Sequence, residues 1–254
     1  MARNTRRELR GDHRNRILAA SVRALRAQWR RALLRLIAEV TDLYRRHQVY
    51  TELVHIVRNN NNALNPPVFF NWARDNYIVS ICLGIRRLSD VRSDSLSLGR
   101  LLREVELRPE IISRASYRAL VRRKHVSAQD ADYTFDLHVG RKHSHVSKNA
   151  VTAEIGRLER SDTRIRKLVN KRLAHNAPFS QMRRPPTFQE IEDSLEEFDK
   201  LLVKYEALIA GGGLSTAWSR LLNWHRVFWK AWVPDGPRAE LPGYEGPQHV
   251  RMSF

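Results

Sequence analysis

The stretch "ILAASVRALRAQWRRALLRLIAEVTDLY", residues 17–44, shows the pattern that decides the fold class. Its apolar residues recur every three or four positions, as on one face of an α-helix. They are Ile17, Val22, Leu25, Trp29, Leu33, Ile37, Val40 and Tyr44. The opposite face carries Arg23, Arg26, Arg30 and Arg35. The stretch therefore predicts a long amphipathic helix with a basic outer face.

The rest of the chain repeats this pattern and predicts an all-α protein. Further helices are expected at 69–88, 98–105, 109–124, 146–160, 164–176, 188–210 and 214–236, whereas 58–67 and 127–145 are expected to be loops. The string "TFQE" at 187–190 is typical of a capping box, in which a Thr and a Glu satisfy the first backbone groups of a helix. No segment alternates polar and apolar residues as a strand does. We expect a basic arm at 1–14, one helical domain at 15–232 and an extended tail at 233–254.

Composition excludes several classes of protein. Cys82 is the single cysteine, which excludes a disulfide framework and most cysteine metal sites, and its apolar surroundings predict a buried thiol. No apolar run is long enough to span a membrane, and no apolar segment directly follows the N-terminal charges as in a signal peptide. We therefore expect a cytoplasmic protein that makes no membrane contact.

The formal net charge of +18 is concentrated in two segments. Residues 1–50 contain 13 Arg or Lys and 4 Asp or Glu, and residues 157–184 contain 9 and 2. Such segments attract polyanions, so RNA, the ribosome or DNA are expected partners. The alternative is an arginine-rich surface that only contacts water. Residues 187–207 have the opposite sign, with 7 acidic and 2 basic residues, and this helix could neutralise the basic surface within the chain or across a dimer.

The motif "LVNKRLAHNA", residues 168–177, is the main candidate for chemistry. On a helix with about 100° per residue, His175 lies at the border of the apolar face, close to Arg164, Lys171 and Arg172. RNA cleavage by the 2′-hydroxyl needs no metal, only groups that move a proton and a cation that stabilises the phosphorus centre. His175 with these cations could supply them. The structural alternative is a histidine that only ends a helix.

Two other groups of residues have weaker functional interpretations. Asp136, His138, His143 and His145 could bind zinc, but their spacing fits no compact zinc motif. Trp218, Trp224 and Trp232 are better explained as core or interface residues than as a platform for stacking bases.

Four segments together resemble the HEPN superfamily, in the branch of the AbiU abortive-infection proteins. They are "NYIVSICLGIRRLSD" (76–90), "DSLSLGRLLREV" (94–105), "LVNKRLAHNA" (168–177) and "WHRVFWKAWVP" (224–234). The resemblance covers roughly residues 15–232. It implies an all-helical bundle, often a homodimer, with roles in RNA cleavage and antiphage defence and toxin-like behaviour in many members. It implies no cofactor, and it adds an antitoxin or a nucleotidyltransferase as a partner.

The resemblance also implies site residues. Asn170, Lys171, Ala174 and His175 fit the branch pattern Arg-Asn-Lys-x-x-Ala-His as they stand, whereas the position of the Arg is Val169. Arg166 lies too far from His175 in sequence to take the place of the motif arginine directly, and Arg172 lies too near. Either could act in space or across a dimer, as could Arg86 and Arg87.

Two functions from different classes follow. The first is a metal-independent endoribonuclease in which His175 is the acid or base, Lys171 and Arg172 hold phosphate, and Asn170 positions them. The second is a catalytically inactive scaffold that binds RNA or a protein. For either one, the expected RNA-binding residues are Arg23, Arg26, Arg30, Arg86, Arg87, Arg164 and Arg166.

Overall fold

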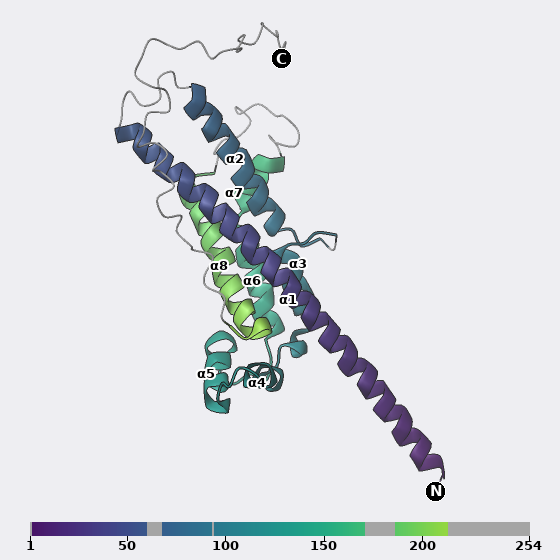
Figure 1. Cartoon of the computed structure of the whole chain (residues 1–254). Coiled ribbons are helices and arrows are strands. Elements are labelled where there is room, and N and C mark those ends of the chain that lie inside the picture. The colour runs from purple at the N-terminus through teal and green to yellow at the C-terminus, as the bar shows by residue number, and fades with distance from the viewer. Residues whose placement is uncertain (1, 60–67, 93, 171–185, 213–254) are drawn as a thin grey trace, which may run out of the picture. The chain divides into compact units, whose positions relative to one another are not determined.

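The computed structural model of the chain is drawn in Figure 1 and describes residues 2–59, 68–92, 94–170 and 186–212. For residues 2–19 and 59 it describes the backbone only. The chain divides into two units, Met1–Arg220 and Leu221–Phe254. The helix expected at 214–236 and the tail expected at 233–254 lie outside the described residues.

The described residues form α-helices and one short 3₁₀ helix with no strand, which confirms the all-α prediction. The elements are α1 (Ala2–Asn59), α2 (Val68–Leu88), α3 (Leu98–Leu107), η1 (Pro109–Ile111), α4 (Arg114–Arg122), α5 (Ala128–Val139), α6 (Lys148–Ser161), α7 (Thr163–Leu168) and α8 (Phe188–Ala210). None of these helices, over the residues described, combines the length and the apolar character that crossing a membrane requires.

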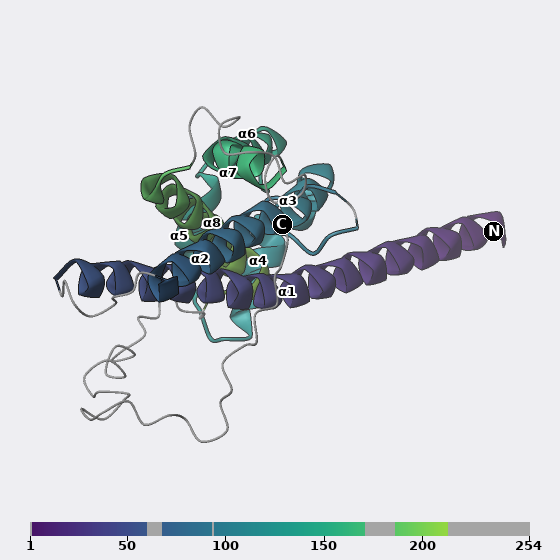
Figure 2. The same cartoon turned by 90° about the horizontal axis from the view of Figure 1, so that it is seen from above.

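Helix α1 is the element against which α2, α3 and α8 pack (Figure 1). Figure 2 shows α2 lying along α1 when the molecule is seen from above. Trp29, Leu33 and Leu36 are at most 1% exposed, and Val40 is fully buried on the same face. A buried side chain of this size stabilises the fold by about 1.5–3 kcal/mol relative to an exposed one. The predicted apolar face of the first long helix is therefore confirmed from Trp29 onward, with Ile37 only partly buried. The prediction is wrong at Val22, which is 38% exposed.

A second group of helices completes the core. Helix α6 packs between α3 and α8, and α4 and α5 pack on each other and on α8. Five apolar residues at helical spacing on α8 are all buried: Ile191, Leu195, Phe198, Leu202 and Tyr205. Together with the face of α1 they belong to one continuous hydrophobic cluster.

The helix ends follow the expected capping chemistry. The backbone N–H of Glu190 donates to Thr187 Oγ1 at 3.3 Å, and the backbone N–H of Thr187 donates to Glu190 Oε2 at 2.9 Å, which confirms the capping box. Ser97 caps α3 by accepting from the backbone N–H of Arg100 at 3.0 Å. Gly211 ends α8 with a φ of 81°, a left-handed conformation that glycine adopts at little cost.

The prediction of a loop at 127–145 is wrong, because residues 128–139 form α5. Only Ala131 and Phe135 on this helix are buried, so its apolar stripe is too narrow to show a helical period in the sequence. The helix is held by tertiary contacts instead. Arg114 of α4 forms ion pairs with both Asp132 and Asp136, which are one turn apart on α5.

The prediction of one continuous helix at 109–124 is also wrong. Residues 109–111 form the 3₁₀ helix η1, and α4 starts only at Arg114. Ser113 separates the two, because its extended backbone and its capping box with Ser116 start a new helix.

Gly99 is a position where the fold leaves no space for a side chain. A Cβ at this residue would lie 2.5 Å from the carbonyl oxygen of Ser89 and 2.8 Å from that of Asp90. Both are backbone atoms and cannot rotate away. We therefore expect Gly99→Ala to lower the free energy of unfolding in urea by about 1–3 kcal/mol.

Gly156, inside α6, provides the matched control. A Cβ there would meet only the end of the Arg160 side chain, at 3.2 Å. Gly156→Ala should leave the free energy of unfolding unchanged or raise it by about 0.5–1 kcal/mol, because alanine favours the helix. Equal effects of the two substitutions would contradict the close approach at Gly99.

Candidate functional site

Helix α7 leads into the sequence motif, and its apolar face is buried. Ile165 is fully buried, Leu168 is 2% exposed and Val169 is 7% exposed. The backbone then continues through Val169 and Asn170 in a π-helical turn, with Asn170 exposed. Of the predicted catalytic residues, Lys171, Arg172 and His175 lie outside the described residues.

The described residues on either side of this motif meet at one cavity. Leu168 and Pro186 both line a cavity of about 130 Å³ between α2, α7, α8 and α1. The complete lining is Tyr50, Arg74, Tyr77, Ile78, Cys82, Leu168, Pro186, Phe188 and Ile191. We refer to it as the aromatic cavity. Described residues on both sides of the undescribed part of the motif therefore line the aromatic cavity.

Three rings give the aromatic cavity its character. Tyr50 and Tyr77 are stacked with ring centroids 4.1 Å apart and an interplanar angle of 9°. Phe188 is nearly parallel to Tyr50, at 5.8 Å and 12°. Cys82 is fully buried as predicted, and burial raises the pKa of its thiol to about 12, so the thiolate is not available at neutral pH.

A chain of hydrogen bonds reaches the aromatic cavity from α8, and sequence analysis missed it. His47 Nδ1 lies 2.7 Å from the Tyr77 hydroxyl, and His47 Nε2 lies 3.1 Å from Glu192 Oε1. A carboxylate can only accept, so we assign the proton to Nε2 and the hydroxyl as the donor to Nδ1. His47 is 6% exposed and looks in sequence like one more residue of a long helix. No motif marks it, because its partners come from α2 and α8.

This chain of hydrogen bonds suits a structural and positioning role better than proton transfer. Both nitrogens of His47 already have partners, so neither is free for a substrate. Burial raises the pKa of the Tyr77 hydroxyl, which keeps it protonated as a donor. The chain thus ties α1, α2 and α8 together beside the aromatic cavity.

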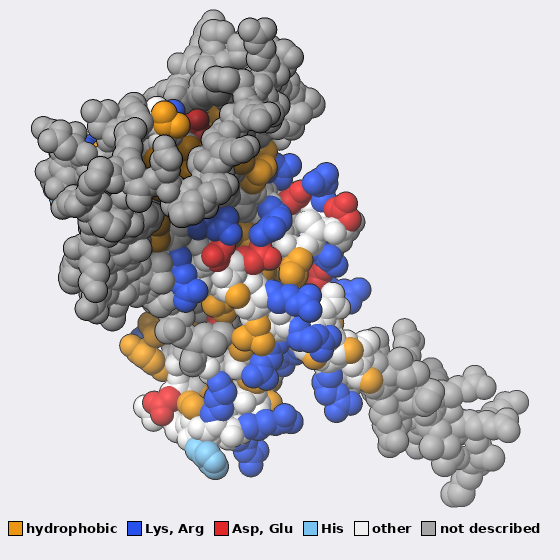
Figure 3. Space-filling view, turned by 45° about the horizontal axis from the view of Figure 1, so that its top comes forward, with side chains coloured by type: hydrophobic (Ala, Val, Ile, Leu, Met, Phe, Trp, Pro, Cys, Tyr) orange, Lys and Arg blue, Asp and Glu red, His pale blue; other side chains and the backbone are white. Residues whose placement is uncertain are grey.

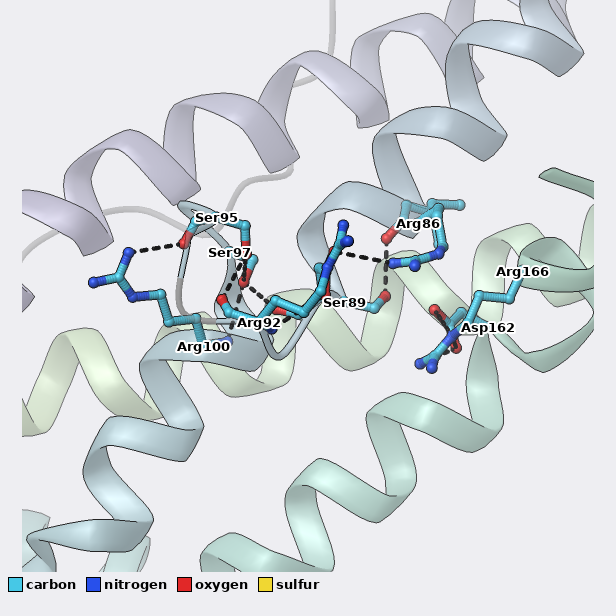
Figure 4. Close-up of polar contacts among 10 residues, drawn as sticks. Arg86, Ser89, Arg92, Ser95, Ser97, Arg100, Asp162 and Arg166 are labelled. Atoms are coloured by element: carbon cyan, nitrogen blue, oxygen red, sulfur yellow. Dashed lines mark hydrogen bonds and ion pairs between the residues drawn. The ribbon is translucent and has the colours of Figure 1, made fainter. Parts of the chain in front are cut away.

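The two predicted RNA-binding arginines of α7, Arg164 and Arg166, both have carboxylate partners. Arg166 Nε lies 3.0 Å from each carboxylate oxygen of Asp162, which is fully buried between α6 and α7. Burial raises the pKa of Asp162, and the hydrogen bond from Arg166 opposes that rise. Figure 4 shows this pair beside Arg86 and Ser89 at the end of α2. Arg166 therefore holds the junction of α6 and α7.

Arg164 and two further predicted RNA-binding residues are paired in the same way. Arg86 lies 3.4 Å from Asp90, Arg87 lies 2.9 Å from Glu39, and Arg164 forms an ion pair with Glu190. The Arg87–Glu39 and Arg164–Glu190 pairs are partly exposed and contribute little to stability. All three pairs reduce the positive field that a polyanion would meet.

The acidic helix α8 supplies carboxylate partners to two arginines of the basic segment 157–184. Glu190 pairs with Arg164 of α7, and Glu197 pairs with Arg157 of α6 at 3.0 Å. Neutralisation of the basic segment by the acidic one was expected within the chain or across a dimer, and these pairs form within the chain.

The arginines of α1 differ from those near α7. Arg23 and Arg30 are exposed, and within the described part of the chain neither has a carboxylate at ion-pair distance. Arg26 is half-buried, one of its terminal nitrogens has no hydrogen-bond partner there, and burial lowers the pKa of its guanidinium. Figure 3 shows Lys and Arg side chains gathered over the face drawn there.

The histidine group considered for zinc does not assemble into a metal site in the described structure. No group of His, Cys, Asp and Glu residues among the described residues is arranged to hold a metal ion. Asp136, the acidic member of that group, is paired with Arg114.

The hydroxyl of Tyr77 offers a test of the hydrogen-bond chain. Tyr77→Phe removes the donor to His47 Nδ1 and leaves a buried nitrogen without a partner. We expect the free energy of unfolding to fall by about 1–3 kcal/mol in urea denaturation. Tyr133→Phe is the matched control, because Tyr133 is 63% exposed, and it should change stability by less than about 0.5 kcal/mol. If Tyr77→Phe leaves the free energy of unfolding unchanged, the chain of hydrogen bonds does not hold the helices together.

Comparison with known proteins gives one result. The family model described as AbiU2, a family of HEPN domains, matches residues 26–226. The match includes α2, α3 and the whole motif from Leu168 to Ala177. No curated protein and no solved structure matches the chain.

Proposed function

Because the chain belongs to the AbiU2 family of HEPN domains, which suggests an abortive-infection protein, we propose that it binds RNA and cleaves it without a metal. In this proposal His175 is the general acid or base. Lys171 and Arg172 hold the phosphate, and Asn170 positions them. The single observation that carries the proposal is the string from Asn170 to His175, which lies inside the family match.

The surroundings of the motif are compatible with this chemistry. Asn170 is exposed while Val169 beside it is buried, so the polar part of the motif begins where the chain reaches solvent. General acid–base catalysis requires a group within hydrogen-bond reach of the proton that it moves. A histidine with an ammonium and a guanidinium group nearby can both transfer that proton and stabilise a phosphorane-like charge.

The alternative is a catalytically inactive HEPN scaffold, and specific observations favour it. Val169 occupies the usual position of the motif arginine and is 7% exposed, packed with the apolar face of α7. Arg166, the nearest arginine before it, is held by Asp162. Val169 carries no guanidinium, and the guanidinium of Arg166 is already paired with Asp162. A scaffold would bind RNA or a protein and would act by holding rather than cutting.

For RNA binding under either function, we favour α1 as the contact surface. Arg23 and Arg30 have no described carboxylate partner, so they can release counterions from a phosphate backbone without first breaking an ion pair. Arg86, Arg87, Arg164 and Arg166 must break one. A homodimer, a ribosomal target, and an antitoxin or nucleotidyltransferase partner remain predictions of the same proposal.

Cleavage of RNA by the purified chain separates the two functions. We expect cleavage in the presence of a metal chelator, and we expect His175→Ala to slow it by about 100- to 10,000-fold. His143→Ala, at an exposed histidine, is the matched control and should leave the rate unchanged. Absence of cleavage at every pH from about 5 to 8, with or without chelator, would leave the scaffold as the function.

Binding to single-stranded RNA tests the α1 surface independently of cleavage. The double variant Arg23→Gln, Arg30→Gln should weaken binding and reduce the slope of log affinity against log salt by about one for each lost contact. The control is Arg46→Gln, Arg118→Gln, which removes the same charge from arginines paired with Asp42 and Asp132. If both double variants weaken binding equally, net charge rather than the α1 surface determines the affinity.

A further inference from the structure

A second cavity lies nearer the N-terminal end of α1, where this helix meets α3 and the loop before it. Its volume is about 170 Å³. It is lined by Gln28, Trp29, Arg31, Ala32, Arg35, Leu96, Ser97, Arg100, Leu101 and Glu104. It shares no lining residue with the aromatic cavity, and we refer to it as the arginine cavity.

Three guanidinium groups line the arginine cavity, and two of them are unpaired. Arg31 and Arg35 stand about one turn apart on α1 and are exposed. Within the described ranges neither has a carboxylate at ion-pair distance, in contrast to Arg46 and Arg87 of α1 and α2. Their donors are therefore available to an anion.

The third guanidinium is held in place. Arg100 Nε donates to Glu104 Oε1 at 2.9 Å, and Arg100 Nη1 donates to the carbonyl oxygen of Ser95 at 3.1 Å. Figure 4 shows the Arg100 side chain directed to Ser95 of the loop between α2 and α3. Two contacts to different elements pre-organise the group, which lowers the entropy lost when it binds a ligand. Its Nη2 has no acceptor among the residues described.

The one acidic residue of the lining does not neutralise Arg31 or Arg35. Glu104 Oε1 accepts from Arg100, and Glu104 Oε2 accepts from Trp29 Nε1 at 2.8 Å. Both oxygens are thus used within the wall. With three arginines and one glutamate the lining has a formal charge of +2, which complements a dianion rather than a monoanion.

The remaining walls strengthen that preference. Trp29 and Leu101 are buried and apolar, so part of the cavity is a low-dielectric surface on which charge interactions are stronger than in open water. Ser97 is not a free donor, because its hydroxyl donates to the carbonyl oxygen of Asp90 and caps α3. Recognition therefore depends on the arginines.

We propose that the arginine cavity binds a phosphate monoester, whose charge of about −1.5 to −2 at neutral pH matches the lining. Internal phosphodiesters of RNA carry only one negative charge, so a terminal phosphate is the preferred group. The phosphate can belong to the 5′ end of an RNA or to a free nucleotide. The proposal goes beyond RNA cleavage and requires no part of the His175 motif.

The test compares two labelled RNA oligomers that differ only in a 5′-phosphate or a 5′-hydroxyl. Both carry 2′-O-methyl groups, which remove the nucleophile and prevent cleavage by the full chain. We expect fluorescence anisotropy to show about tenfold tighter binding of the phosphorylated oligomer, the change that one charge-assisted hydrogen bond produces. Arg31→Gln, Arg35→Gln should abolish this preference. Arg23→Gln, Arg30→Gln should weaken the binding of both oligomers and leave the preference for the 5′-phosphate unchanged.

A second arm identifies the source of the phosphate. Adenosine 5′-monophosphate is titrated into the unlabelled chain by calorimetry, with adenosine as the control. Heat of binding that disappears in Arg31→Gln, Arg35→Gln, without an oligomer preference, would support the site with a free nucleotide as its ligand. If neither the oligomer preference nor nucleotide binding depends on Arg31 and Arg35, the proposal is overturned. Circular dichroism of the double variant checks that it folds.

The same measurements keep the two proposals apart. A chain that shows the 5′-phosphate preference but never cleaves RNA would disprove the nuclease and retain the arginine cavity. A chain that cleaves RNA in a His175-dependent manner, and shows neither the preference nor nucleotide binding that depends on Arg31 and Arg35, would do the reverse.

Discussion

Burial of one face of α1 determines where both cavities form. Trp29 and Leu33 are each 1% exposed on this face, and α2, α3 and α8 all pack against it. The aromatic cavity lies toward the C-terminal part of the helix, where Tyr50 and His47 contact α2 and α8. The arginine cavity lies toward the N-terminal part, where Trp29 contacts Glu104 of α3. A loss of packing along α1 would therefore disturb both.

The distribution of ion pairs decides where on the described surface positive charge is not neutralised. On α2 and α7 the described arginines are paired, and Glu190 of the acidic helix α8 supplies one of the carboxylates. On the part of α1 that precedes Leu36, Arg23, Arg30, Arg31 and Arg35 have no such partner in the described structure. A polyanion binds where positive charge is not already neutralised. The physical contrast thus favours α1 over the surface next to α7, although both segments look equally basic in the sequence.

The candidate catalytic motif favours a nuclease, whereas the described structure around it favours an inactive scaffold. The string from Asn170 to His175 agrees with the family pattern, and the family match includes it. Val169, however, is packed in the core at the position of the usual arginine, and Arg166 is bound to a fully buried Asp162. A helical HEPN domain is common to both functions. Catalysis depends on whether other cations approach His175.

Much of the fold could be predicted from the sequence, because helical periodicity and capping are local properties. The long first helix, the helix ending at Leu88 and the capping box at Thr187 were all predicted. Helix α5 was missed because only Ala131 and Phe135 are buried on it, and Arg114 from another helix holds its acidic face. The types of residue in the candidate sites were visible in the sequence, but their pairing was not. His47 meets Glu192 across 145 positions, and Trp29 meets Glu104 across 75. Only the tertiary structure decides such contacts, because an ion pair or a cavity depends on which helices become neighbours. The sequence by itself determined most of the helices, the family and the amount of charge, and packing decided which of those charges are left free to bind.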